Sequence, residues 1–213
     1  AVGTQNVIEV AIRNNLEKVV AVSTDKAVSP ESVLGASKLM MERLVAAANL
    51  MVGKSRTRFA CVRFGNVTGS RGSVTHLWRK QIEDGGPVTV THKRVKRFFM
   101  EIPDAVSLIF DAMRLMHGGE IFVLKMKKRF VYDYAREVIK KFGNGKKIVI
   151  QFVGLRPGEK LDEELFTKDE HSHMLEIKSM YIITPQHLIP GYPYHQINYP
   201  GARKVRFKAE VAS

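Results

Sequence analysis

The sequence predicts an α/β fold with a parallel β-sheet. Short apolar runs of the kind that form buried strands alternate with segments whose apolar residues recur at helical spacing. The 213 residues are enough to bury a core, and no run of about 18 apolar residues could span a bilayer. The one cysteine, Cys61, excludes a disulfide framework and a cysteine-based zinc site and fits a reducing compartment, so we expect a cytoplasmic protein.

The first half of the chain shows this alternation clearly. Residues 1–15 fit a helix and have neither the basic start nor the apolar run of a signal peptide. "KVVAVS" at residues 18–23 and "RFACVRFG" at residues 58–65 fit buried parallel strands. Residues 30–52 carry the apolar stripe of a helix between them. Residues 73–86 fit a further helix with a serine N-cap and a glycine stop.

The second half continues the pattern. Its expected strands are "PVTVT" (87–91), "EIFVLKM" (120–126), "KIVIQFVG" (147–154) and, at a sheet edge, "MYIIT" (180–184). Its expected helices are residues 102–116 and 131–143. "LRPGEKLDEELF" (155–166) is expected to be a loop that leads into another helix. From residue 185 on, several prolines and the lack of periodicity predict an extended tail.

The composition is basic, with a formal net charge of +13. The lysines and arginines are spread along the chain in runs such as "KMKKRF", which most often form a solvated face. A basic module that binds nucleic acid or an anionic polymer stays an alternative. No zinc-finger spacing, RNA-binding aromatic signature or GxxG loop accompanies the charge, so we expect no nucleic-acid partner. The seven histidines show no metal-ligand spacing, and we expect no metal site.

The segment "STDKAVSPESVLGASK", residues 23–38, is the candidate active site. Polar side chains follow directly after a buried strand, and parallel sheets bind ligands at the carboxyl ends of their strands. Thr24 could hydrogen-bond a substrate hydroxyl, Asp25 could act as a general acid and Lys26 as a general base. Lys38 could return to the same crevice from the next helix. The alternative is a turn or helix cap with solvated lysines.

This segment resembles the active-site segment of the extended short-chain dehydrogenases that act on nucleotide sugars. It is most similar to the polysaccharide-biosynthesis group that includes UDP-N-acetylglucosamine 4,6-dehydratases. The likeness continues in order through "VRFGNVTGSRGSV", "GGPVTVTH", "KRFFMEIPDAV", "GGEIFVL" and "GLRPGEKLDEEL". It implies the C-terminal part of a Rossmann-type parallel sheet with a small substrate-binding lobe. Residues 1–66 would be the remainder of the dinucleotide-binding domain, residues 67–184 the lobe interwoven with returning Rossmann elements, and residues 185–213 the tail.

The resemblance also implies roles for individual residues. The catalytic residues would be Thr24, Asp25, Lys26 and Lys38, and the cofactor, NAD or NADP, would contact Ser23 and Lys38. The residues that would bind the UDP-sugar are Asn66, Arg71, Gly72, Ser73, Val90, Thr91, Arg97, Arg156 and Glu159. Leu34 stands at the position of the family's tyrosine, so Thr24, a water or Lys26 would have to assist oxidation at carbon 4 of the sugar.

The reaction that the resemblance implies is the dehydration of a UDP-N-acetylhexosamine to a 4-keto-6-deoxy sugar for surface polysaccharide or glycan biosynthesis. The cofactor serves as a temporary hydride store. Lys26 would remove the proton from carbon 5, and Asp25 would protonate the departing hydroxyl of carbon 6. A UDP-N-acetylglucosamine 4-epimerase is the alternative within the family.

Two departures from the family pattern are visible. The glycine-rich turn that binds the dinucleotide does not occur in the sequence. We therefore expect this chain alone to be a fragment that binds NAD(P) weakly or not at all. From the resemblance we also expect the full-length protein to be a homo-oligomer. Lys125 and Lys127 stand where family members usually have an aspartate and a glycine.

Overall fold

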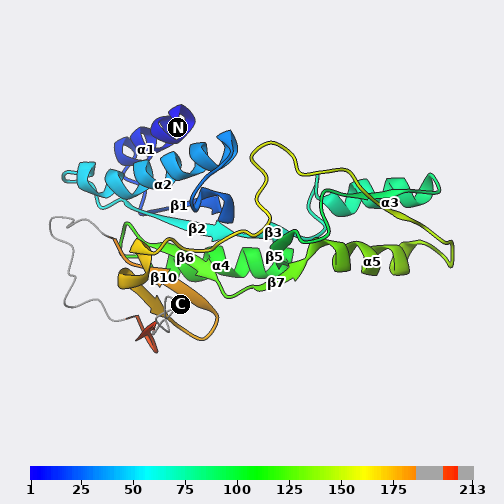
Figure 1. Cartoon of the computed structure of the whole chain (residues 1–213). Coiled ribbons are helices and arrows are strands. Elements are labelled where there is room, and N and C mark those ends of the chain that lie inside the picture. Colours follow the sequence, from blue (N-terminus) through cyan, green and yellow to red (C-terminus); the bar gives the residue numbers. More distant parts are fainter. Residues whose placement is uncertain (186–198, 206–213) are drawn as a thin grey trace.

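The computed structural model describes residues 1–185 and 199–205. The molecule is elongated, with a β-sheet flanked by helices in one half and a smaller helical lobe in the other (Figure 1). The main sheet contains parallel strands, which confirms the predicted α/β class.

The main sheet has six strands. In spatial order they are β1 (Lys18–Thr24), β2 (Arg58–Phe64), β6 (Ile121–Leu124), β10 (Met180–Ile183), β9 (Met174–Glu176) and β11 (Arg203–Lys204). The first three strands are parallel, and the other neighbours pair in antiparallel fashion. The expectation that "MYIIT" lies at an edge was wrong, because β10 is bonded on both sides.

Helices cover both faces of this sheet (Figure 1). One face packs against α1 (Val2–Arg13) and α2 (Val33–Met51), with Val45 and Phe59 in the core between them. The other face packs against α4 (Ile102–Leu115). α2 begins three residues later than predicted, because the Ser32 hydroxyl caps it by accepting a 3.1 Å hydrogen bond from the Gly35 amide.

The lobe is built around two helices, α3 (Val74–Glu83) and α5 (Val131–Phe142). Its strands are β3 (Asn66–Val67), β5 (Lys96–Met100) and β7 (Lys127–Phe130) in one sheet, and β4 (Val88–Val90) and β8 (Ile150–Phe152) in another. The fully buried Trp78 anchors the lobe core, and its indole N–H donates a 2.7 Å hydrogen bond to the Thr89 carbonyl. Between β5 and β7 the chain visits the main sheet through α4 and β6, and after β8 it returns there through η2, β9 and β10.

One prediction about the C-terminal third was wrong. The segment after "LRPGEK" forms no α-helix; only the short 3₁₀ helix η2 (Asp169–His173) follows. Within the predicted tail, Tyr199 is buried and β11 pairs with β9, so residues 199–205 pack on the main sheet. Residues 186–198 and 206–213, the rest of that tail, lie outside the described residues.

A buried ion network holds the end of β2 in place. Arg63 is 1% exposed, and its guanidinium makes paired hydrogen bonds to the carboxylates of Glu42 on α2 and Glu170 on η2. It also donates a 2.7 Å bond to the Leu165 carbonyl. Because buried charges are stable only when they are paired, this network links three distant segments of the chain.

Candidate functional site

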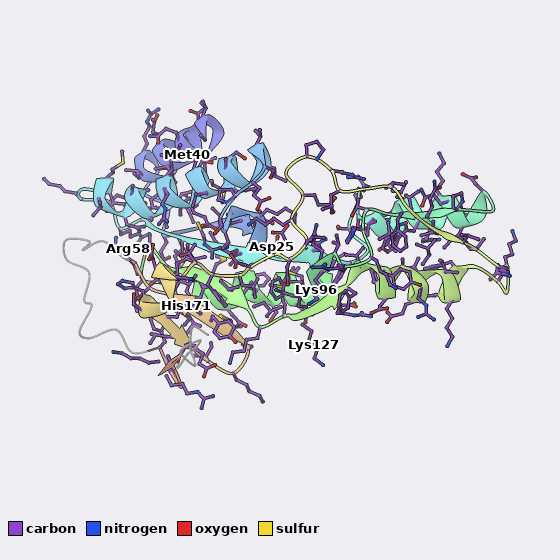
Figure 2. All side chains as sticks on the ribbon, viewed as in Figure 1. Asp25, Met40, Arg58, Lys96, Lys127 and His171 are labelled. Atoms are coloured by element: carbon purple, nitrogen blue, oxygen red, sulfur yellow. The ribbon has the colours of Figure 1, made fainter. Side chains whose placement is uncertain are left out.

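A cavity of about 340 Å³ opens where the main sheet meets the lobe. Its walls come from the 3₁₀ turn η1 (Asp25–Ala27), from β3, α3, β4 and β5, and from the loop at residues 153–163. Asp25 and Lys96 mark this junction in Figure 2. The cavity lining contains these residues singled out in the sequence: Lys26, Asn66, Val90, Thr91, Arg97, Arg156 and Glu159.

One wall carries an acid and an amine. β1 ends at Thr24 and the chain turns sharply through η1, which places Asp25 and Lys26 at the carboxyl end of the strand. The Lys26 ammonium donates a 2.9 Å hydrogen bond to Oδ1 of Asp25 and a 3.3 Å bond to Oδ1 of Asn66. The Thr24 hydroxyl donates to the same Asp25 oxygen at 2.9 Å. Lys26 faces the cavity, while Asp25 lies fully buried behind it.

The second oxygen of Asp25 is unusual. Within residues 1–185 and 199–205, Oδ2 is buried and has no hydrogen-bond partner. A buried carboxylate oxygen without a partner is costly, so it marks a position where a proton or a ligand donor is expected.

The turn that carries Lys26 is packed tightly against α2. A Cβ atom at Gly35 would lie 2.3 Å from the Lys26 carbonyl oxygen and 3.0 Å from Cβ of Pro30. Glycine is therefore the residue that lets the first turn of α2 approach η1 so closely.

The opposite wall carries an ordered guanidinium–carboxylate pair. Arg97, 5% exposed, donates a 2.9 Å hydrogen bond to Oε1 of Glu159. The Thr91 hydroxyl donates to the same oxygen at 3.0 Å, and the Arg156 amide donates to Oε2 at 3.1 Å. The Arg156 residue itself is exposed at the cavity rim. This wall can offer cationic donors to an anion and a fixed acceptor to hydroxyl groups.

Glu163 is a cavity residue that the sequence reasoning missed. It is 3% exposed, and its Oε1 lies 4.0 Å from Nε of Arg97. Burial, reinforced by the nearby Asp25 carboxylate, raises the pKa of the Glu163 carboxyl. The sequence signal for Glu163 is weak. It lies in the acidic run of "LDEELF", and that run does not indicate which of its carboxylates is buried.

A second group of expected residues lies outside the cavity lining. Ser23 is buried at the end of β1, and within the described part of the chain its hydroxyl has no hydrogen-bond partner. Lys38 donates a 2.8 Å bond from Nζ to the Val22 carbonyl. Leu34, four residues earlier on the same helix, is 56% exposed. These residues gather at the carboxyl end of β1, beside the Asp25 turn.

The start of α3 holds the remaining expected residues. Arg71 and Gly72 are exposed, and Gly72 has a φ of 75°, in the left-handed region that favours glycine. Ser73 is the N-cap of α3, yet its side chain makes no capping bond, and its hydroxyl is buried with no partner among the described residues. None of the three lines the cavity described above, although the next residue, Val74, does.

Comparison with known proteins identifies the family. The sequence matches the family described as polysaccharide biosynthesis protein over residues 1–185. The chain belongs to this family. The chain spans about half the length of several curated relatives that it matches.

Three proteins that are similar to this chain carry different names. An uncharacterized membrane protein of Methanocaldococcus jannaschii is 48% identical, with 86% of this chain and 57% of the relative covered. A UDP-N-acetylglucosamine 4,6-dehydratase (inverting) of Campylobacter jejuni is 36% identical, with 86% and 53% covered. A UDP-glucose 4-epimerase of Rickettsia canadensis is 38% identical, with 85% and 52% covered. Among the described residues, no helix is long and apolar enough to cross a membrane.

Solved structures agree with the fold. The structure of Pen from Bacillus thuringiensis is 43% identical to this chain, has a TM-score of 0.83, and aligns over 86% of this chain and 57% of its own. A dTDP-glucose 4,6-dehydratase (DesIV) from Streptomyces venezuelae, solved with NAD and TYD bound, has a TM-score of 0.68 at 18% identity and aligns over 92% of this chain and 63% of its own. The architecture is therefore that of the Rossmann-type dehydratases and epimerases.

Proposed function

We propose that the intact protein binds a UDP-N-acetylhexosamine in the junction cavity and converts it to a 4-keto-6-deoxy sugar with the help of NAD or NADP. The observation that carries the proposal is the juxtaposition of two chemically different walls. Lys26, backed by the buried Asp25 carboxylate with which it pairs, lies on one wall of the cavity. The Arg97–Glu159 pair lies on another wall of the same cavity.

The Arg97 wall suits the nucleotide part of such a substrate. Arg97 and Arg156 would pair with the diphosphate, because guanidinium groups bind phosphate through parallel hydrogen bonds. Glu159 offers fixed carboxylate oxygens to the ribose hydroxyls. Val90 and Thr91 would line the uracil.

Asn66 and the start of α3 would hold the phosphate nearest to the sugar. Asn66 already accepts a hydrogen bond from Lys26, so it connects the phosphate region with the reacting end of the cavity. Arg71, Gly72 and Ser73 precede α3, where free backbone amides favour an anion. The buried Ser73 hydroxyl has no hydrogen-bond partner within residues 1–185 and 199–205, so it is free there to donate to a phosphate oxygen.

The residues at the carboxyl end of β1 fit one end of the cofactor. The buried Ser23 hydroxyl and the Lys38 amine provide two polar groups of the kind that hold a ribose. When bound, NAD(P) would accept a hydride from the sugar and return it. Because the glycine-rich turn for the dinucleotide phosphates is not in this sequence, only the nicotinamide-ribose end is accounted for.

Asp25 and Lys26 would carry out the elimination. A ketone at carbon 4 acidifies the proton on carbon 5, which the Lys26 amine can reach from the cavity wall. Asp25, hydrogen-bonded to the same amine, would supply the proton to the departing hydroxyl. Leu34 has no proton to exchange, so Thr24, a water or Lys26 remains as the group that assists the oxidation step.

A 4-epimerase is the second candidate, because UDP-glucose 4-epimerases are among the relatives. Epimerisation needs no acid to expel a hydroxyl, so the buried Asp25 beside Lys26 favours the dehydratase.

The test is to incubate the intact natural protein with UDP-N-acetylglucosamine and NAD or NADP and to follow the sugar by NMR. A dehydratase gives a 4-keto-6-deoxy product, whereas an epimerase gives the 4-epimer with no loss of water. Asp25→Asn and Lys26→Ala should each lower turnover by about 10²–10⁴-fold while UDP affinity is retained. Full turnover of both variants would contradict the assigned roles. Glu17→Gln, at an exposed residue outside the cavity lining, serves as the control.

A further inference from the structure

We propose that Glu163 is a third ionisable member of the Asp25–Lys26 cluster, a positioning residue that controls which of the two partners holds their shared proton. The proposal rests on the proposed function and deepens it. No motif considered in the sequence assigns a role to Glu163.

The backbone holds Glu163 between the two walls of the cavity. Just before it, the Lys160 ammonium donates a 2.7 Å hydrogen bond to the Val28 carbonyl, directly after η1. The Leu161 carbonyl accepts a 2.8 Å bond from the Lys96 amide, at the start of β5. Glu163 is therefore placed between the turn that carries Lys26 and the strand that carries Arg97.

Two buried carboxylates near Lys26 each keep one oxygen free. Within residues 1–185 and 199–205, neither Oδ2 of Asp25 nor Oε2 of Glu163 has a hydrogen-bond partner. Both residues are at most 3% exposed. A nearby carboxylate disfavours the ionised form of a buried carboxyl group, so the ionisation of Glu163 is coupled to the charge on Asp25.

The charges around Glu163 come from every element that packs against it. They are Asp25 and Lys26 on η1, Arg97 on β5 and Lys160 on its own loop. Burial contributes most to raising the pKa of the Glu163 carboxyl, and repulsion from Asp25 comes next, outweighing the attraction from any one of the three cations. The strongest electrostatic coupling of Glu163 is therefore to Asp25.

This coupling matters because the Lys26 amine and the Asp25 carboxyl group are close enough to exchange a proton directly. Lys26 and Asp25 form an ion pair at 2.9 Å, whereas the elimination needs a neutral Lys26 and a protonated Asp25. One proton must move from Nζ of Lys26 to Asp25, and the pair neither gains nor loses a proton. An ionised Glu163 repels the Asp25 carboxylate more than it attracts the Lys26 ammonium, so it favours the reactive form. Lys26 then takes the carbon 5 proton, Asp25 gives its proton to the hydroxyl that leaves as water, and the ion pair is restored.

The first test is the pH dependence of turnover in the intact protein with NAD or NADP and UDP-N-acetylglucosamine. In the natural protein, kcat should rise with pH as Glu163 ionises. Glu163→Gln should lose this rising limb and lower kcat at the alkaline plateau by about tenfold, with KM unchanged. The control is Glu164→Gln, the exposed neighbour. An unchanged profile, or an equal loss at every pH with the limb retained, would overturn the proposal.

The second test does not depend on turnover. In protein labelled with ¹³C at the glutamate carboxyls, the Glu163 signal is identified by its absence in Glu163→Gln or Glu163→Asp. It should titrate above the ordinary range for glutamate, and Asp25→Asn should shift its midpoint downward. A Glu163 signal that titrates in the ordinary range, or that ignores Asp25→Asn, would refute the coupling. If the coupling is present but no UDP-sugar is dehydrated, the proposed function fails while the coupled cluster remains.

Discussion

The guanidinium of Arg97 donates a 2.9 Å hydrogen bond to the carboxylate of Glu159 across the wall of the cavity. The carboxylate is held in turn by the Thr91 hydroxyl and the Arg156 amide. An incoming phosphate would therefore meet a guanidinium that is already oriented, so little side-chain freedom is lost on binding. The same contacts mean that Arg97 and Arg156 should respond differently to mutation.

Arg156→Ala should weaken UDP binding without affecting stability. Arg156 is exposed at the rim, so removing its side chain leaves no buried group unpaired. The loss of one charge-assisted contact to phosphate should raise the Kd for UDP by about tenfold or more, measured by calorimetry. Arg94→Ala, which removes an exposed arginine outside the cavity lining, is the matched control. Equal affinities for the two variants would rule out Arg156 as a phosphate ligand.

Arg97→Ala should affect both binding and stability. Arg97 is 5% exposed, and its loss would leave Glu159 without its ion-pair partner and Glu163 without its nearest guanidinium. Breaking a buried pair from one side costs about 3–5 kcal/mol, and a somewhat smaller loss is expected here because Glu159 is partly exposed. Urea unfolding measures the change. A variant with unchanged unfolding free energy would show that the pair does not stabilise the lobe.

The elements that sequence reasoning found are those whose own residues form an apolar run or an amphipathic pattern. The apolar runs of β1 and β2 and the amphipathic patterns of α3 and α5 lie where they were predicted, within a few residues. The strands that were missed are β3, β5, β7, β9 and β11, which have two to five residues each. Such short strands are defined by their pairing with distant segments, which no local pattern reveals.

The segment at residues 155–166 shows why one helix was predicted wrongly. Its acidic and leucine residues are compatible with a helix, but the Lys96 amide bonds to the Leu161 carbonyl and keeps this part of the chain beside β5. Leu165 is buried in the core beside Val123 and Met174. Tertiary contacts therefore override the local preference.

Charge patterns were the least informative part of the sequence. The run "KMKKRF" was expected to form a solvated face, and Lys127 is indeed exposed (Figure 2). Lys125, however, pairs with Glu176 at 2.8 Å, and Lys128 pairs with Asp162 at 2.5 Å. In the same way, Glu163 is held in place by contacts of its chain neighbours with remote residues. Lys160 bonds to the Val28 carbonyl, and the Leu161 carbonyl accepts a bond from the Lys96 amide. The motif residues of the cavity could be found from the sequence, whereas the buried carboxylate of Glu163 could not.

Gly35→Ala should displace η1, which carries the proposed catalytic residues Asp25 and Lys26. The added methyl would lie 2.3 Å from the Lys26 carbonyl oxygen, far inside contact distance, so either the turn or the start of α2 must move. A displacement of the catalytic amine by about 1 Å should lower kcat by about 10²-fold. Gly3→Ala, where the added methyl meets no atom within 4 Å, is the control. Normal turnover by Gly35→Ala would mean that the turn tolerates this shift.

The thiol of Cys61 should be inert in the folded protein. Cys61 is 1% exposed in the core between the sheet and α2, and burial raises the pKa of its thiol. The reactive thiolate is therefore scarce as well as inaccessible. Labelling with a disulfide reagent at pH 8 should proceed only as fast as the protein opens, and urea should accelerate it in step with unfolding. Rapid labelling in the absence of urea would contradict this packing.

The buried network around Arg63 should make stability depend on pH through Glu170. Hydrogen bonds from Arg63, together with its charge, lower the pKa of the Glu170 carboxyl in the folded state below its ordinary value of 4.5, against the opposing effect of burial. A depressed pKa contributes stability above the unfolded value, and this contribution is lost as the pH falls through the folded value. Glu170→Gln should therefore lower the unfolding free energy by about 1–3 kcal/mol at pH 7.

The difference between Glu170→Gln and the natural protein should shrink as the pH falls below 4.5, because the natural carboxyl becomes protonated as well. Urea unfolding at a series of pH values measures this, with Glu17→Gln, at an exposed residue, as the control. A penalty that stays constant down to pH 3 would show that the network acts through shape alone. A penalty that grows toward low pH would mean that the carboxyl is protonated in the fold, and that Arg63 is balanced by Glu42 only.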